Sequence, residues 1–349
     1  MEKVQKRDTS ADILRIFASL TVFIVHFFLN TEYYFLEINT STMMIATCIR
    51  QFAMCCVPLF LMLTGYLYSG KEIEFNKSHI LKLTKVLIPY TIITILTFLF
   101  VTSTGVNANA NLATMLFGFE NNGYTWYIEA YLGIYLLIPF LNTMYNNLKS
   151  KNQKQILVGI FATICFLPSL INITGTVVFM DYWKTLMPIA YYFVGVYLKE
   201  YPLKLNKRKC FVILVVSEII LSILGLTVFK DNLMEHQSNG YGNLFNAINS
   251  ILIFSIISKI NTDKLKDKTK TRLSKLSNKV LSAYMISYIV DKIFYLVFLP
   301  SFAPTFEQKV LFMPICIITI FIFSFMFGSI IEKISSLINK LIFKKIKST

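Results

Sequence analysis

Charged residues are scarce in this 349-residue chain: they make up 15% of it, whereas hydrophobic residues make up 55%. A soluble globular protein carries nearer a quarter charged residues, so this scarcity excludes an ordinary soluble domain. Long polar connections are lacking too, and none between the apolar runs is long enough to form a separate soluble domain. The sequence shows no low-complexity segment and no clear internal repeat.

Cysteine patterns and leader signals are also missing. The six cysteines lie in or beside apolar runs, and their spacing matches neither a metal site nor a disulfide framework. We interpret them as free apolar side chains and predict no metal site. The first apolar run lacks a small-residue cleavage site, so we expect it to be a retained span rather than a signal peptide.

What the chain has instead is runs of about 20 apolar residues, each long enough to cross a bilayer. They predict an all-α, polytopic membrane protein with about ten transmembrane helices. We expect residues 1–349 to form one membrane-embedded domain, with a basic cytoplasmic tail over 332–349. The expected spans are 11–29, 44–68, 80–101, 126–145, 155–173, 183–198, 210–229, 243–258, 280–299 and 310–331.

The formal net charge of +15 would suggest nucleic acid in a soluble protein. Here all but five of the 34 Lys and Arg residues fall at the N-terminus, in alternate connections and in the tail. The positive-inside rule therefore places both termini in the cytoplasm and explains the charge by topology, with lipid head groups as a second use. We expect no nucleic-acid partner. The Lys-, Ile- and Asn-rich composition suggests a bacterial cytoplasmic membrane.

Arg15 and His26 stand out in the first apolar run. They are about three helical turns apart, roughly 16 Å along the axis, and so share one face of a helix. Titratable groups are costly inside a membrane and usually mark a pathway or a site. The Arg could hold an anion near the cytoplasmic end, and the His could move a proton. The alternatives are an Arg that snorkels to the interface and a His satisfied by a neighbouring helix.

Two further groups of residues flank the third and fourth spans. Lys82 and Lys85, one turn apart, could form a cytosolic phosphate cradle with Arg15, although ordinary positive-inside flanking also explains them. Trp126 and Tyr127 open the fourth span, where an interfacial aromatic belt accounts for them. Glu129 lies about one turn further in, at the depth expected for His26, and could orient its imidazole.

For other polar residues within the predicted spans, a functional and a purely structural role are equally compatible with the sequence. They are Glu218, Ser287, Asp291 and Lys292. Asp291 is deep enough in its span to need a partner, whereas the adjacent Lys292 points elsewhere on a helix.

The pattern Arg15-x10-His26 resembles the opening of the acyltransferase-3 family of membrane acyltransferases. Four later segments resemble the family in the same order, so the likeness spans nearly the whole chain. The sequence departs from the family at Tyr131 and Leu132, where one branch has paired glutamates, and at Ser287, which replaces a late His. The four segments are Pro58 to Tyr66, Lys82-x2-Lys85 with Pro89-Tyr90, Trp126 to Pro139, and Leu281 to Ser287.

This resemblance implies transfer of an acyl group, most often acetyl, from cytosolic acyl-CoA to a hydroxyl of an extracytoplasmic glycan such as a cell-envelope polysaccharide. Acyl-CoA is then a donor substrate, and no cofactor is expected to be bound tightly. Arg15, Lys82 and Lys85 would neutralise the CoA phosphates. His26 would be a general base or a transient acyl carrier, oriented by Glu129. Trp126 or Tyr127 would stack on sugar.

Two other functions remain as alternatives. A transporter or flippase for a glycan or small polar molecule could use the same buried Arg, His and Glu as a substrate or proton path, but inverted repeats and matched Gly/Pro-broken spans are missing. A membrane sensor or scaffold would explain the topology without using Arg15 or His26.

Overall fold

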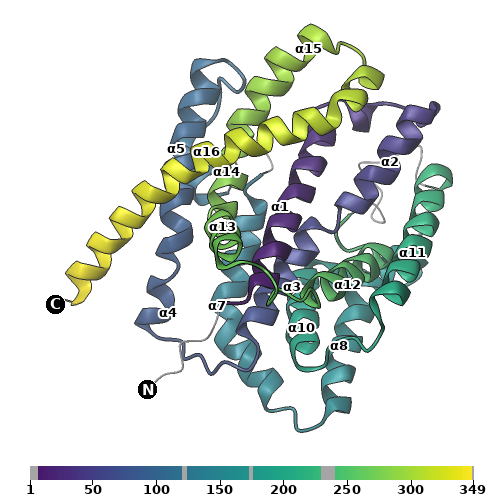
Figure 1. Cartoon of the computed structure of the whole chain (residues 1–349), viewed down its shortest axis with the longest axis vertical. Helices are drawn as coiled ribbons and strands as arrows, with labels where there is room; N and C mark the ends of the chain where they lie inside the picture. The colour runs from purple at the N-terminus through teal and green to yellow at the C-terminus, as the bar shows by residue number, and fades with distance from the viewer. Residues whose placement is uncertain (1–6, 120–123, 173–175, 229–239, 348–349) are drawn as a thin grey trace. The chain divides into compact units, whose positions relative to one another are not determined.

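The computed structural model of the chain describes residues 7–119, 124–172, 176–228 and 240–347, with side chains to residue 344. The regular secondary structure in these ranges is helical throughout, which confirms the predicted all-α class (Figure 1). Eight helical segments are long and apolar enough to cross a membrane. Shorter helices, α10 (Met187–Glu200) and α12 (Leu244–Ser258), occupy the predicted spans 183–198 and 243–258. The count of ten spans and the location of the termini stay predictions.

Backbone contacts divide the chain into two compact units, each assembled from separate stretches of sequence. The first unit contains Met1–Val25, Tyr34–Ser69 and Ser150–Asn278, and the second contains His26–Tyr33, Gly70–Lys149 and Lys279–Thr349. Helix α1 (Thr9–Leu29) contributes to both. That the chain forms a single domain stays a prediction.

The first unit is built around a close contact between α3 (Cys56–Tyr68) and α10. A Cβ atom at Gly65 would overlap the backbone carbonyl of Tyr192, and one at Gly195 would overlap that of Met62. Glycine therefore lets the two backbones touch, as small residues do between membrane helices. Besides its part of α1, the remaining elements of this unit are α2 (Ser41–Ala53), α8 (Lys151–Phe166), α9 (Pro168–Ile171), η2 (Tyr182–Leu186), α11 (Lys207–Thr227), α12 and α13 (Asp267–Ser277).

Helix α11 shows how a polar group is accommodated in an apolar helix of this unit. Its outward face is exposed and aliphatic, whereas Glu218 turns inward and accepts a 2.7 Å hydrogen bond from Asn249 of α12. A carboxyl group within a span needs such a partner, because no water is available to solvate it. The sequence left Glu218 open, and the structure gives it this contact between neighbouring helices.

The second unit is built on α5 (Thr84–Ser103), α14 (Val280–Ile293) and α16 (Phe306–Lys347), which pack against one another. Helix α16 is the long yellow helix that crosses α5 and α14 in Figure 1. Gly328 of α16 lies against the backbone of Ala283, so these two helices also meet at a glycine. The remaining elements are η1 (Tyr33–Phe35, shared with the first unit), α4 (Lys77–Leu81), α6 (Leu112–Phe117), α7 (Trp126–Asn146), η4 (Phe294–Phe298) and α15 (Leu299–Phe302).

Candidate functional site

His26 lies in the last turn of α1 and is buried, with 6% of its surface exposed. Its Nδ1 atom lies 3.5 Å from Oδ2 of Asp291, which is fully buried in α14. This distance is longer than a formed hydrogen bond, but catalytic hydrogen bonds often tighten only when substrate binds. The fully buried carboxyl group of Asp291, which sequence analysis left open, is therefore the group that faces the imidazole.

Tyr124, just before α7, contacts both His26 and Asp291. Its hydroxyl donates a 2.8 Å hydrogen bond to Oδ2 of Asp291, and its ring lies against that of His26 with ring centroids 3.8 Å apart and the planes tilted by 36°. The backbone carbonyl of Tyr124 accepts a hydrogen bond from the hydroxyl of Tyr284 in α14. Burial, with the nearby Asp291 carboxylate, holds the pKa of Tyr124 well above its ordinary value, so its phenol stays protonated and donates.

The unused atoms of the site indicate what it can do chemically. Within the described residues, Oδ1 of Asp291 and both ring nitrogens of His26 form no hydrogen bond, and only Nδ1 faces the carboxyl group, at 3.5 Å. A carboxylate next to Nδ1 stabilises the imidazolium that forms when Nε2 takes up a proton. The arrangement can therefore act as a general base at Nε2, with Asp291 as the orienting partner.

Glu129, the partner predicted for His26, lies elsewhere. It is exposed in the first turn of α7, and its side chain forms no hydrogen bond or ion pair with the residues that the structure describes. The predicted contact between Glu129 and His26 is therefore not formed. Helical periodicity places Glu129 on a different face of α7 from the buried Ile128, and depth along a helix says nothing about rotation around it.

Trp126 and Tyr127 lie at the start of α7 and are half-buried. Their rings contact each other edge to face, with centroids 6.3 Å apart, and Tyr127 contacts Tyr284 in the same way at 6.2 Å. The Tyr284 ring in turn lies 5.9 Å from that of His26. Aromatic rings therefore lead continuously from the two predicted sugar-stacking residues to the imidazole, although stacking on sugar stays a prediction.

Asp291 carries a signal that the sequence could have given more weight. It is an acid in an apolar span, and Tyr284 and Ser287 precede it by two turns and one turn on the same face of α14. Ser287 is fully buried and donates a 2.8 Å hydrogen bond to the carbonyl of Tyr284. Ser287 thus satisfies the helix backbone, while Asp291 faces His26.

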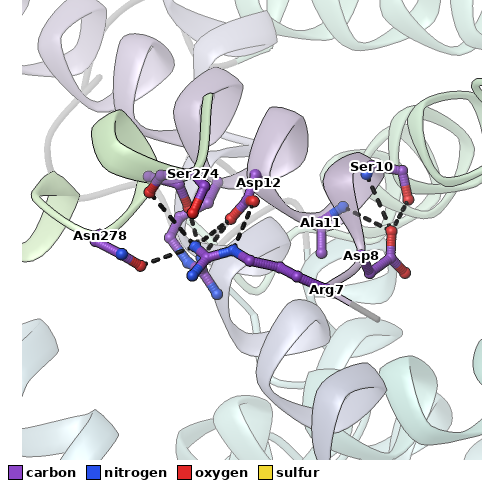
Figure 2. Close-up of polar contacts among 9 residues, drawn as sticks. Arg7, Asp8, Ser10, Ala11, Asp12, Ser274 and Asn278 are labelled. Atoms are coloured by element: carbon purple, nitrogen blue, oxygen red, sulfur yellow. Dashed lines mark hydrogen bonds and ion pairs between the residues drawn. The ribbon is translucent and has the colours of Figure 1, made fainter. Parts of the chain in front are cut away.

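Arg15, in the first unit, is part of a different polar cluster. Its Nη1 atom lies 2.6 Å from the hydroxyl of Ser277 and 3.4 Å from Oδ1 of Asp12. Figure 2 shows the neighbouring Arg7, which binds both oxygens of Asp12 at 2.8 and 2.7 Å and also bonds Asn278 at 2.8 Å. The side-chain hydrogen bond to Asp12 raises the pKa of Arg7 further, so it stays charged. Arg7 and Arg15 thereby join the start of α1 to the end of α13, and Asp12 holds both guanidinium groups in place.

Lys82 and Lys85 are both exposed at the junction of α4 and α5 in the second unit. Neither side chain forms a hydrogen bond or ion pair with another described residue, so both are available to an anion. The adjacent His79 is not, because it is buried, stacks on Tyr135 with centroids 4.4 Å apart, and has Nε2 3.0 Å from the Tyr135 carbonyl oxygen. A common cradle of Arg15 with these lysines stays a prediction.

Comparison with known proteins gives the family. A family model described as an acyltransferase domain, that of the acyltransferase-3 family, matches residues 8–331. A search of the curated proteins and a search of the solved structures each found no match. The matched range includes every residue described around His26 and Asp291. It also includes every residue of the polar cluster around Arg15 except Arg7. The chain therefore belongs to the acyltransferase-3 family, and it is a multi-pass membrane acyltransferase.

Proposed function

We propose that this protein transfers an acyl group, with acetyl as the expected group, from cytosolic acyl-CoA to a hydroxyl of an extracytoplasmic glycan in a bacterial cytoplasmic membrane. The observation that carries the proposal is the buried His26, which has Asp291 at Nδ1 and no hydrogen bond at Nε2 within the described residues. A buried base with a carboxylate partner suits removal of a proton from a hydroxyl.

In the proposed reaction, Nε2 of His26 takes the proton of the acceptor hydroxyl while the oxygen attacks the thioester carbonyl. The new C–O bond forms, the C–S bond breaks, and the proton leaves His26 for the CoA thiolate. Asp291 would stabilise the imidazolium that exists between these two proton transfers. This route needs no acyl-enzyme, although an acyl group carried transiently on Nε2 would use the same atom.

Other residues of the chain would hold the donor and the acceptor. Lys82 and Lys85 would attract the phosphates of acyl-CoA as exposed point charges. Arg15, whose side chain is 27% exposed and bonds Asp12 and Ser277, would add a positive charge for the same phosphates. Trp126 and Tyr127 would stack on the acceptor sugar.

The first test uses purified protein in lipid nanodiscs with acetyl-CoA and cell-envelope glycan from the producing organism. We expect release of free CoA that depends on the glycan, and its loss in His26→Ala. Ser287→Ala is the matched control, because this buried residue bonds only the helix backbone of α14. Unchanged CoA release in His26→Ala would contradict the mechanism.

The second test identifies the product in cells. Surface glycan from cells with the wild-type protein, with His26→Ala and without the gene is compared by proton NMR before and after mild base. Base-labile acetyl signals lost in both altered strains would support O-acetylation. Unchanged signals, together with glycan movement across the membrane without CoA release, would favour a transporter instead.

A further inference from the structure

Asn30, directly after α1, joins the His26 site to a lysine that sequence analysis left unassigned. Its nitrogen Nδ2 lies 2.8 Å from the hydroxyl of Tyr124 and 2.8 Å from the backbone carbonyl oxygen of His26. Its oxygen Oδ1 lies 2.9 Å from Nζ of Lys292, the residue after Asp291. Hydrogen bonds therefore link Lys292, Asn30, Tyr124 and Asp291 in that order, and Oδ2 of Asp291 lies 3.5 Å from Nδ1 of His26.

The direction of these hydrogen bonds is set at Asn30. A lysine ammonium can only donate, and a backbone carbonyl oxygen can only accept. Lys292 must therefore face Oδ1 of Asn30, and the carbonyl of His26 must face Nδ2. Turning the amide over would place donor against donor at one end and acceptor against acceptor at the other. The second N–H of Asn30 consequently points at the hydroxyl oxygen of Tyr124.

Tyr124 passes this direction on to Asp291. Its hydroxyl oxygen accepts from Asn30, so its single proton is directed at Oδ2 of Asp291. A proton on Oδ2 would face the proton of Tyr124, so Oδ2 itself carries no proton and acts only as an acceptor.

Oδ2 of Asp291 in turn determines which nitrogen of His26 is protonated, because it is the oxygen that faces Nδ1. Because Oδ2 offers Nδ1 only an acceptor, the imidazole carries its proton at Nδ1. Nε2 then keeps its lone pair. This tautomer is the one that can take a proton from an acceptor hydroxyl.

We infer that Asn30 and Lys292 are positioning residues that hold His26 in the tautomer with an unprotonated Nε2. The inference rests on the proposed role of His26 in acyl transfer and deepens it. Both residues act on the imidazole through Tyr124 and Asp291 rather than on the reacting atoms.

The test uses variants that change which atoms donate and which accept these hydrogen bonds, with little change in side-chain shape. Asn30→Asp is isosteric but offers Tyr124 only an acceptor, so the tyrosine proton can turn away from Asp291. Lys292→Met keeps the length of the side chain but removes the donor and its charge, and Lys292→Arg restores both. Lys309→Met is the matched control. Lys309 also belongs to the second unit, but it bonds Glu32 at 2.7 Å and takes no part in the series of hydrogen bonds near His26.

The first readout is nitrogen NMR of protein labelled with 15N-histidine in nanodiscs. The chain has three histidines, and the signal lost in His26→Gln assigns this one. We expect the wild type, Lys292→Arg and Lys309→Met to show His26 protonated at Nδ1 alone. Asn30→Asp and Lys292→Met should show a mixture of protonation states.

The second readout is steady-state acyl transfer by the same samples, after size exclusion has shown that each is folded. We expect kcat to fall about tenfold or more in Asn30→Asp and Lys292→Met, with KM for acyl-CoA changed less than about twofold. Lys292→Arg should recover most of the wild-type kcat.

The outcomes separate this inference from the proposed function. Wild-type His26 signals and wild-type kcat in folded Lys292→Met and Asn30→Asp would overturn the inference, while an inactive His26→Ala would leave the proposed function standing. Conversely, activity retained in His26→Ala would overturn the proposed function. The tautomer comparison would still decide whether the chain of hydrogen bonds controls His26.

Discussion

Asp12 in the first unit and Asp291 in the second are both buried carboxylates that other side chains approach, yet their surroundings differ. Both oxygens of Asp12 are bonded by Arg7, and Oδ1 is also approached by Arg15. Asp291 has a hydrogen bond only at Oδ2, from Tyr124, and its other oxygen has none among the described residues. The Asp12 carboxylate is paired with two arginines, which stay charged. The Asp291 carboxyl group faces a histidine and has no arginine or lysine bonded to it in the described residues.

The difference indicates two uses of the same functional group. A fully bonded carboxylate between guanidinium groups anchors one segment to another, and a proton transfer there would break the anchor. A buried carboxylate with spare acceptor capacity is costly unless something uses it, and here it faces an imidazole that can change its charge. We therefore expect changes at Asp12 to affect stability and changes at Asp291 to affect chemistry.

The largest expected effect is that of Asp291→Asn. The amide has nearly the same shape but cannot stabilise the imidazolium of His26, so we expect kcat to fall about 100-fold or more. The measurement is CoA release by folded protein in nanodiscs. Ser287→Ala, one turn away on α14 and equally buried, should stay within about twofold of the wild type. Near wild-type turnover in Asp291→Asn would remove the distinction between the two carboxylates.

A smaller and different effect is expected for Asp12→Asn. This change weakens the ion pairs with Arg7 and Arg15 and the favourable charge in the first turn of α1, which together are worth about 1–2 kcal/mol. The midpoint of thermal unfolding in detergent should fall while kcat changes little. Asp267→Asn is the control, because its fully exposed side chain forms only a 3.7 Å ion pair with Lys270. A loss of kcat as large as that of Asp291→Asn would show that Asp12 also serves the chemistry.

Next in size is the double change of Lys82 and Lys85 to Gln. These exposed cations would act on donor phosphates by long-range attraction, so we expect KM for acyl-CoA to rise about threefold to tenfold with kcat unchanged. Added salt should raise KM of the wild type toward that of the variant. Lys275→Gln, on the exposed face of α13, is the control for loss of surface charge. An unchanged KM would mean that these lysines do not bind the donor and serve only the membrane topology.

The smallest effect is expected for Glu129→Gln, which should leave kcat within about twofold of the wild type. Its side chain is exposed and makes no polar contact with the described residues, so no partner is lost. The same CoA-release assay measures it beside Asp291→Asn. A loss comparable to that of Asp291→Asn would restore Glu129 as the partner of His26 and displace Asp291.

The helices themselves were predictable from the sequence, because each apolar run between polar connections has only one stable solution in a bilayer. Every predicted span contains a helix, including the two that turned out short. The family likeness was also visible, since the Arg15 and His26 spacing and later segments such as the one around Gly65 keep their order in the chain. The role of Gly65 could not be predicted. A Cβ atom there is excluded by the backbone of Tyr192, which belongs to a helix distant in sequence.

The sequence by itself determined the helical class, the positions of the spans and the candidate His26, because hydropathy and charge act locally along the chain. Only the tertiary structure decided that His26 faces Asp291 instead of Glu129, that His79 is a packing residue, and that Asn30 joins Lys292 to Tyr124. These pairings depend on how each helix is rotated about its axis. Rotation is set by contacts with helices far away in sequence, so no local pattern records it.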